Sequence, residues 1–134
     1  MSRLRKTKAF AVKLKDSQKL EHSSSGGAFT AISDVFLSCG GVVVSSVYNY
    51  ETSQTEFALY DTTKVRDEAR GSKYMQSYPL DVFQEAETWL KNNSGNVLFV
   101  GVGCQADGFR RFMELRGLRN RVPIVGIICH GSSS

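Results

Sequence analysis

The sequence predicts an α/β domain with a mostly parallel sheet, helices on both faces and an antiparallel β-hairpin. Residues 97–100 and 123–129 are apolar runs of the kind expected for parallel strands buried on both faces. A helical pattern over residues 105–117 separates them, which makes a βαβ unit with a right-handed crossover. Residues 42–50 and 56–60 flank a short polar turn, so they are expected to form the hairpin.

Length and composition indicate one soluble domain. The chain has 134 residues, 41% hydrophobic and 22% charged, which is an ordinary globular balance. No apolar run is long enough to cross a membrane, and the basic N-terminus is not followed by a signal-peptide core. Three widely spaced cysteines suit a reducing compartment, so we expect a cytoplasmic protein. Residues 1–134 form the domain, with a flexible basic leader at 1–8 and a flexible tail at 132–134.

The first third of the chain contains one predicted helix. Alternating apolar residues over 8–14 predict a short edge strand, and residues 16–22 are polar and turn-like. Helical spacing predicts a helix over 26–39, with a serine N-cap before it and Gly40 and Gly41 after it. Its apolar positions are Phe29, Ile32, Val35, Phe36 and Leu37. Cys39, at the end of that helix, is interpreted as a core residue.

A second helix is predicted downstream of the hairpin. Residues 67–74 are polar and punctuated by glycine, which is typical of a loop. Pro79 lies near the start of a helix that runs to Asn92. Its apolar stripe is Leu80, Phe83, Ala86, Trp89 and Leu90.

Two cysteines follow the predicted parallel strands. Cys104 comes after the first strand and Cys129 ends the second. Because ligands of parallel sheets bind beyond the carboxyl ends of the strands, both thiols are expected at one rim. From position alone, a functional pair and two structural cysteines both stay open. His22 and His130 show no metal-ligand spacing with each other.

Three segments could bind an anion. The turn Gly101–Gln105 opens a helix, but Ala106 stands where a dinucleotide fingerprint has its third glycine. Residues 23–27, Ser-Ser-Ser-Gly-Gly, precede another helix and could equally be a flexible capped entry. Lys73, in Gly71–Tyr74, could hold a phosphate or lie beside a flavin, or it could belong to a plain surface turn.

Basic residues cluster at Arg110, Arg111, Arg116, Arg119 and Arg121. Such a cluster is most often the solvated face of a helix. It lacks interleaved aromatic residues and any known reader motif, so nucleic acid is not expected as a partner.

Five motifs occur in a specific order: Ser23–Ala31 (SSSGGAFTA), Gly40–Val44 (GGVVV), Arg70–Ser77 (RGSKYMQS), Val97–Gln105 (VLFVGVGCQ) and Ile128–Gly131 (ICHG). In this order the chain resembles the N-terminal region of the coenzyme F420 hydrogenase/dehydrogenase beta-subunit family. The resemblance covers roughly residues 9–131, and its specificity comes from the five motifs in register.

The resemblance implies an oxidoreductase subunit that passes electrons between [4Fe–4S] clusters, FAD and a substrate such as a deazaflavin coenzyme. It implies cluster ligation by Cys104 and Cys129, two of the four thiolates that such a cluster needs. It also implies a flavin pocket lined by Ser24, Ser25, Gly26, Gly27, Ser72, Lys73, Tyr74, Gly101 and Gln105.

The chain departs from the family pattern in three ways. Val102-Gly103 stands where the family has Thr-Pro, Ser132–Ser134 replaces the usual continuation, and the remaining cluster cysteines are missing. We therefore expect a fragment of a longer protein, or a short relative, that has incomplete cofactor sites and no activity alone. Its expected partners are the C-terminal region of its parent, other redox subunits or a ferredoxin-type electron donor. The alternative is a non-catalytic α/β domain that binds a nucleotide or a partner.

Overall fold

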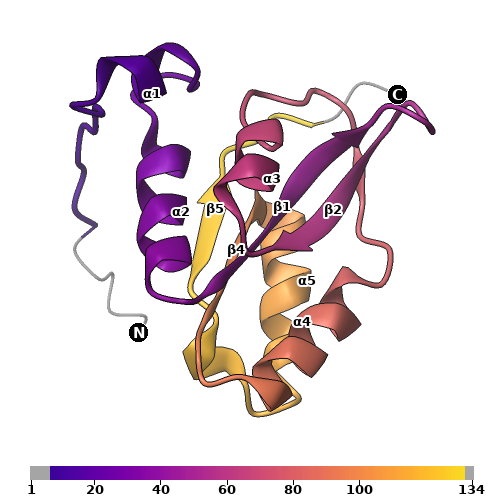
Figure 1. Cartoon of the computed structure of the whole chain (residues 1–134). Helices are drawn as coiled ribbons and strands as arrows, with labels where there is room; N and C mark the ends of the chain where they lie inside the picture. Colours follow the sequence, from indigo (N-terminus) through magenta and orange to yellow (C-terminus); the bar gives the residue numbers. More distant parts are fainter. Residues whose placement is uncertain (1–6, 132–134) are drawn as a thin grey trace.

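A computed structural model of the protein describes residues 7–131 (Figure 1). The predicted tail at 132–134 and residues 1–6 of the predicted leader lie outside the described residues. The described chain forms a five-stranded sheet in the order β3-β2-β1-β4-β5. β1 pairs antiparallel with β2 and parallel with β4, and β4 pairs parallel with β5. The predicted α/β class, hairpin and parallel pair are therefore confirmed.

The elements follow one another as α1 (Ser17–Glu21), α2 (Ala28–Ser38), β1 (Val42–Asn49), β2 (Gln54–Tyr60), α3 (Thr63–Glu68), β3 (Ser77–Tyr78), α4 (Val82–Asn92), β4 (Val97–Val102), α5 (Gly103–Glu114), a 3-10 turn (Arg119–Arg121) and β5 (Ile124–Ile127). Among the described residues, no helix is long and apolar enough to cross a membrane.

Helices cover both faces of the sheet, as the sequence predicts. Along β4, Val97 and Phe99 point to the face covered by α4 and α5, whereas Leu98 and Val100 point to the face covered by α2 and α3. Successive side chains of a strand alternate between the two faces, so a central strand must be apolar at every position. This alternation explains why 97–100 is a continuous apolar run.

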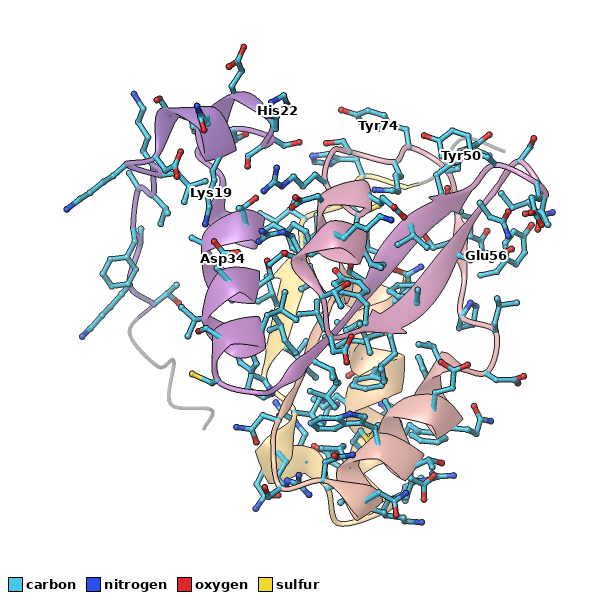
Figure 2. All side chains as sticks on the ribbon, viewed as in Figure 1. Lys19, His22, Asp34, Tyr50, Glu56 and Tyr74 are labelled. Atoms are coloured by element: carbon cyan, nitrogen blue, oxygen red, sulfur yellow. The ribbon has the colours of Figure 1, made fainter. Side chains whose placement is uncertain are left out.

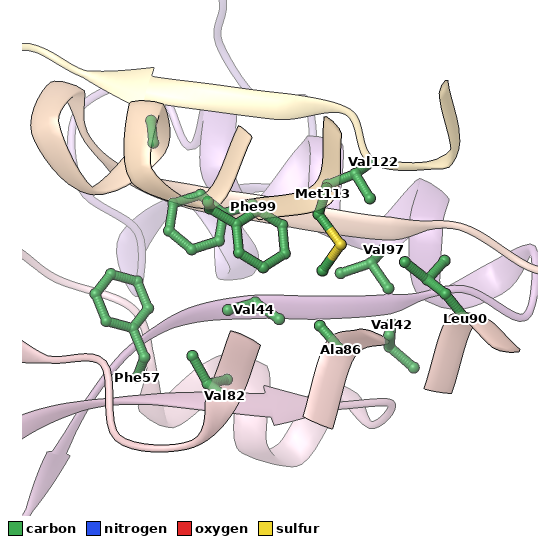
Figure 3. Packing of buried hydrophobic residues seen from close by; sticks show 12 residues of the cluster. Val42, Val44, Phe57, Val82, Ala86, Leu90, Val97, Phe99, Met113 and Val122 are labelled. Atoms are coloured by element: carbon green, nitrogen blue, oxygen red, sulfur yellow. The ribbon is translucent and has the colours of Figure 1, made fainter. Parts of the chain in front are cut away.

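Aliphatic side chains and aromatic rings fill the face beneath α4 and α5 (Figure 3). Phe99 stacks on Phe57 and on Phe109, with ring centroids 5.3 and 4.4 Å apart. Phe83 meets Phe109 edge-on at 5.0 Å. Offset-stacked and edge-on pairs are the favoured geometries for aromatic rings. This cluster anchors α4 and α5 to the centre of the sheet.

The opposite face contains a buried polar group. The Arg66 side chain of α3 is only 2% exposed, and its guanidinium lies against α2. It donates to the Thr30 carbonyl, to Ser33 Oγ and to Asp34 Oδ1. A buried charge needs such partners because it has lost its hydration. Arg66 therefore binds the inward face of α2, which also packs Phe29, Phe36 and Leu37 against the sheet.

That contact corrects the predicted apolar stripe of α2. Thr30 and Ser33 are buried, whereas Ile32 and Val35 are exposed. The helix itself is confirmed, but Gly27, with a φ of 77°, is its N-cap, and no serine caps it. Cys39 is exposed, so its interpretation as a core residue is wrong: α2 ends at Ser38 and the chain turns outward there.

Several local predictions near the N-terminus are wrong. Residues 8–14 form no strand; Leu14 pairs through its backbone N–H with the Gly26 carbonyl, which covers the start of α2. Residues 17–21 form a helix because Asp16 accepts a hydrogen bond from the Lys19 amide and caps it. The short elements α3 and β3 were not predicted.

The predictions for β5 and for the start of α4 need smaller corrections. β5 is an edge strand whose last residue, Ile127, is exposed, so it is not buried on both faces. Leu80 is also exposed, because α4 begins only at Val82. The inward face of α4 is formed by Val82, Ala86 and Leu90.

Candidate functional site

The carboxyl ends of β1, β4 and β5 point to the same edge of the sheet, at the top of Figure 1. Val102 and Ile127, the last residues of β4 and β5, are paired in register. Cys104 and Cys129 each lie two residues beyond that pair, and both are exposed. This edge, which we call the thiol rim, is where a parallel sheet offers a ligand site.

The two rim thiols have different surroundings. Cys104 lies in the first turn of α5, beside Gly103, around whose Cα there is open space. Cys129 Sγ accepts a hydrogen bond from the Gly131 amide at 3.2 Å. Within residues 7–131, no group of three or more His, Cys, Asp or Glu side chains could hold a metal ion. The rim therefore offers two thiol ligands to a larger site.

Gln105, a predicted flavin-binding residue, holds the end of β4 in place. Its Oε1 accepts from the Val102 amide at 3.2 Å, and its Nε2 donates to the Ser77 carbonyl at 3.4 Å. Ser77 belongs to β3, at the far edge of the sheet. The side-chain amide thus connects the start of α5 to β3 beside the thiol rim.

Gly101 has a packing reason to be glycine. A Cβ at this position would lie 2.9 Å from a ring carbon of Phe99 and 3.2 Å from one of Phe57. These distances are shorter than ordinary van der Waals contacts between carbon atoms. The glycine allows the aromatic cluster to extend beneath the last residues of β4.

The serine–glycine loop lies at the same end of the sheet, because α2 runs from there toward the start of β1 (Figure 1). Its glycines contact the chain's own N-terminal segment. A Cβ on Gly26 would overlap the Val12 carbonyl oxygen, and one on Gly27 would collide with the Leu14 side chain. Segment 12–14 therefore covers the two glycines.

The serines of this loop divide into two kinds. Ser23 Oγ donates to the Lys19 carbonyl and pairs with Thr30 Oγ1, so it connects α1 to α2. Ser24 and Ser25 are exposed, and Ser25 has a left-handed φ of 51°. Only Ser24 and Ser25 could present hydroxyls to a ligand without breaking a bond between elements.

Lys73 is bound by the carbonyls that follow α3. Its Nζ donates to the Ala69, Arg70 and Gly71 oxygens at 2.8, 3.2 and 3.4 Å. Burial lowers the pKa of this ammonium. Cations favour the C-terminal end of a helix, where carbonyls lack partners.

The neighbours of Lys73 in the loop, Ser72 and Tyr74, are exposed. Figure 2 shows Tyr74 at the upper edge of the molecule, as it does Tyr50 at the tip of the hairpin. The loop thus brings a cation and an aromatic ring to the end of the molecule where the parallel strands finish.

The arginines of the basic cluster at 110–121 form ion pairs and hydrogen bonds with other parts of the chain. Arg110 pairs with Asp107 and Glu114, and Arg116 pairs with Glu87 while its guanidinium lies 3.4 Å from the Phe112 ring centroid. Arg121 donates to the backbone carbonyls of Leu90, Asn93 and Gly95. The Arg110 pairs lie within α5, whereas Arg116 and Arg121 fasten the segment after α5 to α4 and to the turn that follows it.

Two surface hollows also lie among the described residues. One of about 520 Å³ runs along α4, beside Trp89 and Gln84. The other, of about 540 Å³, lies between α1 and α3 and is lined by several charged side chains, Arg66 among them. Sequence analysis did not single out Arg66, because a lone arginine in a six-residue helix has no pattern that marks it as buried.

These features define an α/β domain with a mixed sheet and an exposed pair of thiols beyond two adjacent parallel strands. No family model matches the chain, and no curated protein matches its sequence. A solved structure does match it: a chain of the F420-reducing [NiFe] hydrogenase complex from Methanosarcina barkeri, with a TM-score of 0.66 and 24% identity. The match covers 87% of this chain and 42% of the hydrogenase-complex chain, so this chain spans less than half of that length. The similarity establishes a shared fold.

Proposed function

We propose that this chain is the N-terminal domain of an oxidoreductase subunit that passes electrons between [4Fe–4S] clusters, FAD and a substrate such as a deazaflavin coenzyme. The observation that carries the proposal is the thiol rim, where Cys104 and Cys129 follow the register pair Val102–Ile127. The fold shared with a chain of the F420-reducing hydrogenase complex supports it.

The chemistry of the rim fits part of a cluster site. Iron–sulfur clusters are held by Cys thiolates, usually four of them. Cys104 and Cys129 are both exposed and free of disulfides, and no third ligand joins them in residues 7–131. Cys104 and Cys129 would hold two irons, and further thiolates would have to come from another segment or subunit. When bound, the cluster would supply one-electron transfer.

The FAD part of the proposal rests on three loops at one end of the sheet. They carry Ser24, Ser25 and Gly26–Gly27, then Ser72–Tyr74, then Gly101 and Gln105. The amides at the start of α5 would favour an anionic group there. The chain's role would be to orient the flavin against the cluster side of the rim.

The proposed partners are those that would supply the missing cluster ligands and the rest of the flavin pocket. The remaining region of a longer parent, or other redox subunits, would complete both cofactor sites, and a ferredoxin-type donor would deliver electrons. We place the protein in the cytoplasm, where thiolates stay reduced. Alone, residues 1–134 would hold no complete cluster and would not turn over.

The rim can be tested through the distance between its thiols. The chain has three exposed cysteines, so C39S leaves only the rim pair, whereas C129S leaves Cys39 and Cys104. Cys39 follows α2, next to the start of β1, at the opposite end of the sheet. A short bifunctional thiol reagent is expected to bridge the pair within one molecule in C39S and not in C129S, as measured by mass spectrometry of the intact chain. Equal yields in both variants would contradict the thiol rim.

Cluster binding needs its own experiment. Anaerobic reconstitution of residues 1–134 with iron and sulfide is expected to give no stable [4Fe–4S] absorption, because two thiolates leave two irons without protein ligands. A chain extended by its native downstream region, if it has one, is expected to hold a cluster that is lost in C104S/C129S. A cluster that survives this double substitution would refute the ligand assignment.

A non-catalytic nucleotide-binding domain is the second candidate. It is favoured by the internal bonds of Lys73 and Gln105 and by the cover that segment 12–14 places on Gly26 and Gly27. A fluorescence titration with FAD separates the two functions. Weak binding that K73A weakens further supports the flavin site, whereas FAD affinity unchanged by K73A favours the second candidate.

A further inference from the structure

The cleft of about 540 Å³ between α1 and α3 is lined by none of the residues assigned to FAD, although His22 and Arg70 lie two residues before Ser24 and Ser72. Its volume is within the range of small-molecule sites. Three of its lining residues carry a full positive charge: Lys19, Arg66 and Arg70. We propose that this cleft binds the phosphate groups of a small molecule through these cations. The proposal does not depend on the flavin or cluster assignments.

The cations are held in position by an alternating chain of ion pairs. Asp34 pairs with Lys19 at 2.6 Å and with Arg66 at 2.5 Å. Asp67 in turn pairs with Arg66 at 2.7 Å and with Arg70 at 2.9 Å. Lys19, Arg66 and Arg70 thus share the carboxylates of Asp34 and Asp67, and Glu21, which also lines the cleft, balances the third positive charge. Figure 2 shows Lys19 above Asp34, where α1 meets α2.

The two guanidinium groups still have donors to offer. The hydrogen bonds of Arg66 leave from Nε and Nη1, which leaves Nη2 available. The Arg70 side chain is 12% exposed, and its buried Nε has no hydrogen-bond partner among residues 7–131. A buried donor without an acceptor is costly, so Arg70 gains by turning toward an acceptor in the cleft. Guanidinium groups bind phosphate oxygens in pairs, which suits this arrangement.

Two other lining residues modify the site. His22, the C-cap of α1, also lines the cleft and adds a ring N–H donor. Glu21 lines the same cleft and has no ion pair in the described part of the chain, so its carboxylate opposes an anion. The expected ligand is a compact group such as a diphosphate, whose oxygens the guanidinium donors of Arg66 and Arg70 can bind in pairs.

Inorganic pyrophosphate, titrated calorimetrically into the full chain at low salt, tests the proposal. R70Q is expected to weaken binding roughly tenfold, since a hydrogen bond to a charged group is worth about that factor. K19Q should also weaken it, and E21Q should tighten it. K91Q is the matched control, because Lys91 is an exposed cation on α4 that pairs with Glu87. Circular dichroism verifies that each variant is folded.

The outcomes are distinct. Weaker pyrophosphate binding by R70Q and K19Q, but not by K91Q, supports the site. Equal effects of all three substitutions would show that pyrophosphate is attracted only by the general positive charge of the protein. No measurable binding of pyrophosphate to the unmodified chain would also overturn it. Competition then identifies the source of the phosphate. If FAD displaces pyrophosphate, and R70Q weakens FAD binding, the cleft holds the diphosphate of the flavin; if AMP displaces it and FAD does not, the ligand is a separate nucleotide.

Discussion

The face of the sheet under α4 and α5 is an apolar core, whereas the face under α2 and α3 combines an apolar cluster with a buried arginine. On the first face, Phe99 and Phe109 are fully buried and stack on each other. On the second, Arg66 and the buried pair Ser45–Tyr60, with oxygens 2.7 Å apart, are satisfied by hydrogen bonds. Apolar packing alone stabilises the first face, whereas the second combines apolar packing with matched donors and acceptors.

The difference has a consequence for function. An apolar core is destabilised by any cavity that opens in it, and its closely packed side chains have little room to move. A polar network can exchange an internal partner for a ligand atom at much lower cost. The candidate phosphate cleft, the serine–glycine loop and the Lys73 loop are all attached to the polar face, so we expect ligand binding to reorganise α1 and α3 before it affects α4 and α5.

The largest expected effect is on the apolar face. Phe99→Ala should lower the free energy of unfolding by about 3–5 kcal/mol, because it removes a ring at the centre of the aromatic cluster and leaves a cavity. Urea unfolding followed by fluorescence measures this. Leu115→Ala is the control, since Leu115 is 86% exposed and should change stability by less than about 0.5 kcal/mol. Similar losses for both substitutions would contradict the apolar core.

The polar face is tested by Arg66→Met, which keeps the apolar stem and removes the charge. We expect a loss of about 2–3 kcal/mol, less than for a fully enclosed ion pair, because Asp34 and Asp67 are partly exposed and retain Lys19 and Arg70. Lys64→Met, on the exposed side of α3, is the control. An Arg66→Met variant as stable as the parent would show that packing alone holds this face.

The pH dependence of stability gives a finer test of the face under α2 and α3. Burial by itself would raise the pKa of Asp34, but hydrogen bonds from Lys19 and Arg66, together with their charges, lower the pKa below its ordinary value of 3.8. A carboxyl with a lowered pKa stabilises the folded state above that value and loses this contribution as the pH falls below it. Asp34→Asn should therefore be less stable than the parent at pH 7, with a smaller decline between pH 4 and pH 2 in thermal unfolding. If stability fell with pH in the same way in Asp34→Asn and in the parent, Asp34 would not contribute to the stability of this face.

The smallest expected effect comes from glycine. Gly108 lies inside α5 with nothing within 4 Å of the place where an alanine Cβ would lie, so Gly108→Ala should raise stability by about 0.5–1 kcal/mol through helix propensity. Gly101→Ala should instead destabilise the protein, because its Cβ would meet the Phe99 ring. Thermal unfolding of the two variants should therefore show shifts of opposite sign. Shifts of the same sign would show that the aromatic cluster can move aside.

Much of the site geometry could be predicted from sequence, and the limits have physical causes. The apolar run at 97–100 is typical of a doubly buried strand, so the parallel pair and the common rim of Cys104 and Cys129 were predicted from it. The roles of Gly26 and Lys73 could not be predicted, because their partners, Val12 and the carbonyls after α3, lie in segments without a periodic pattern.

Local chemistry alone determined the helices with strong periodicity, the hairpin and the order of strand, helix and strand, since these depend on neighbours a few residues apart. Only the tertiary structure decided that Thr30 and Ser33 face inward in place of Ile32 and Val35. The reason is that the Ser33 hydroxyl and the Thr30 carbonyl accept from Arg66, more than 30 positions later in the chain, while the Thr30 hydroxyl pairs with that of Ser23. The demand for those acceptors outweighs the apolar pattern of α2, and it arises only when α2 and α3 pack together.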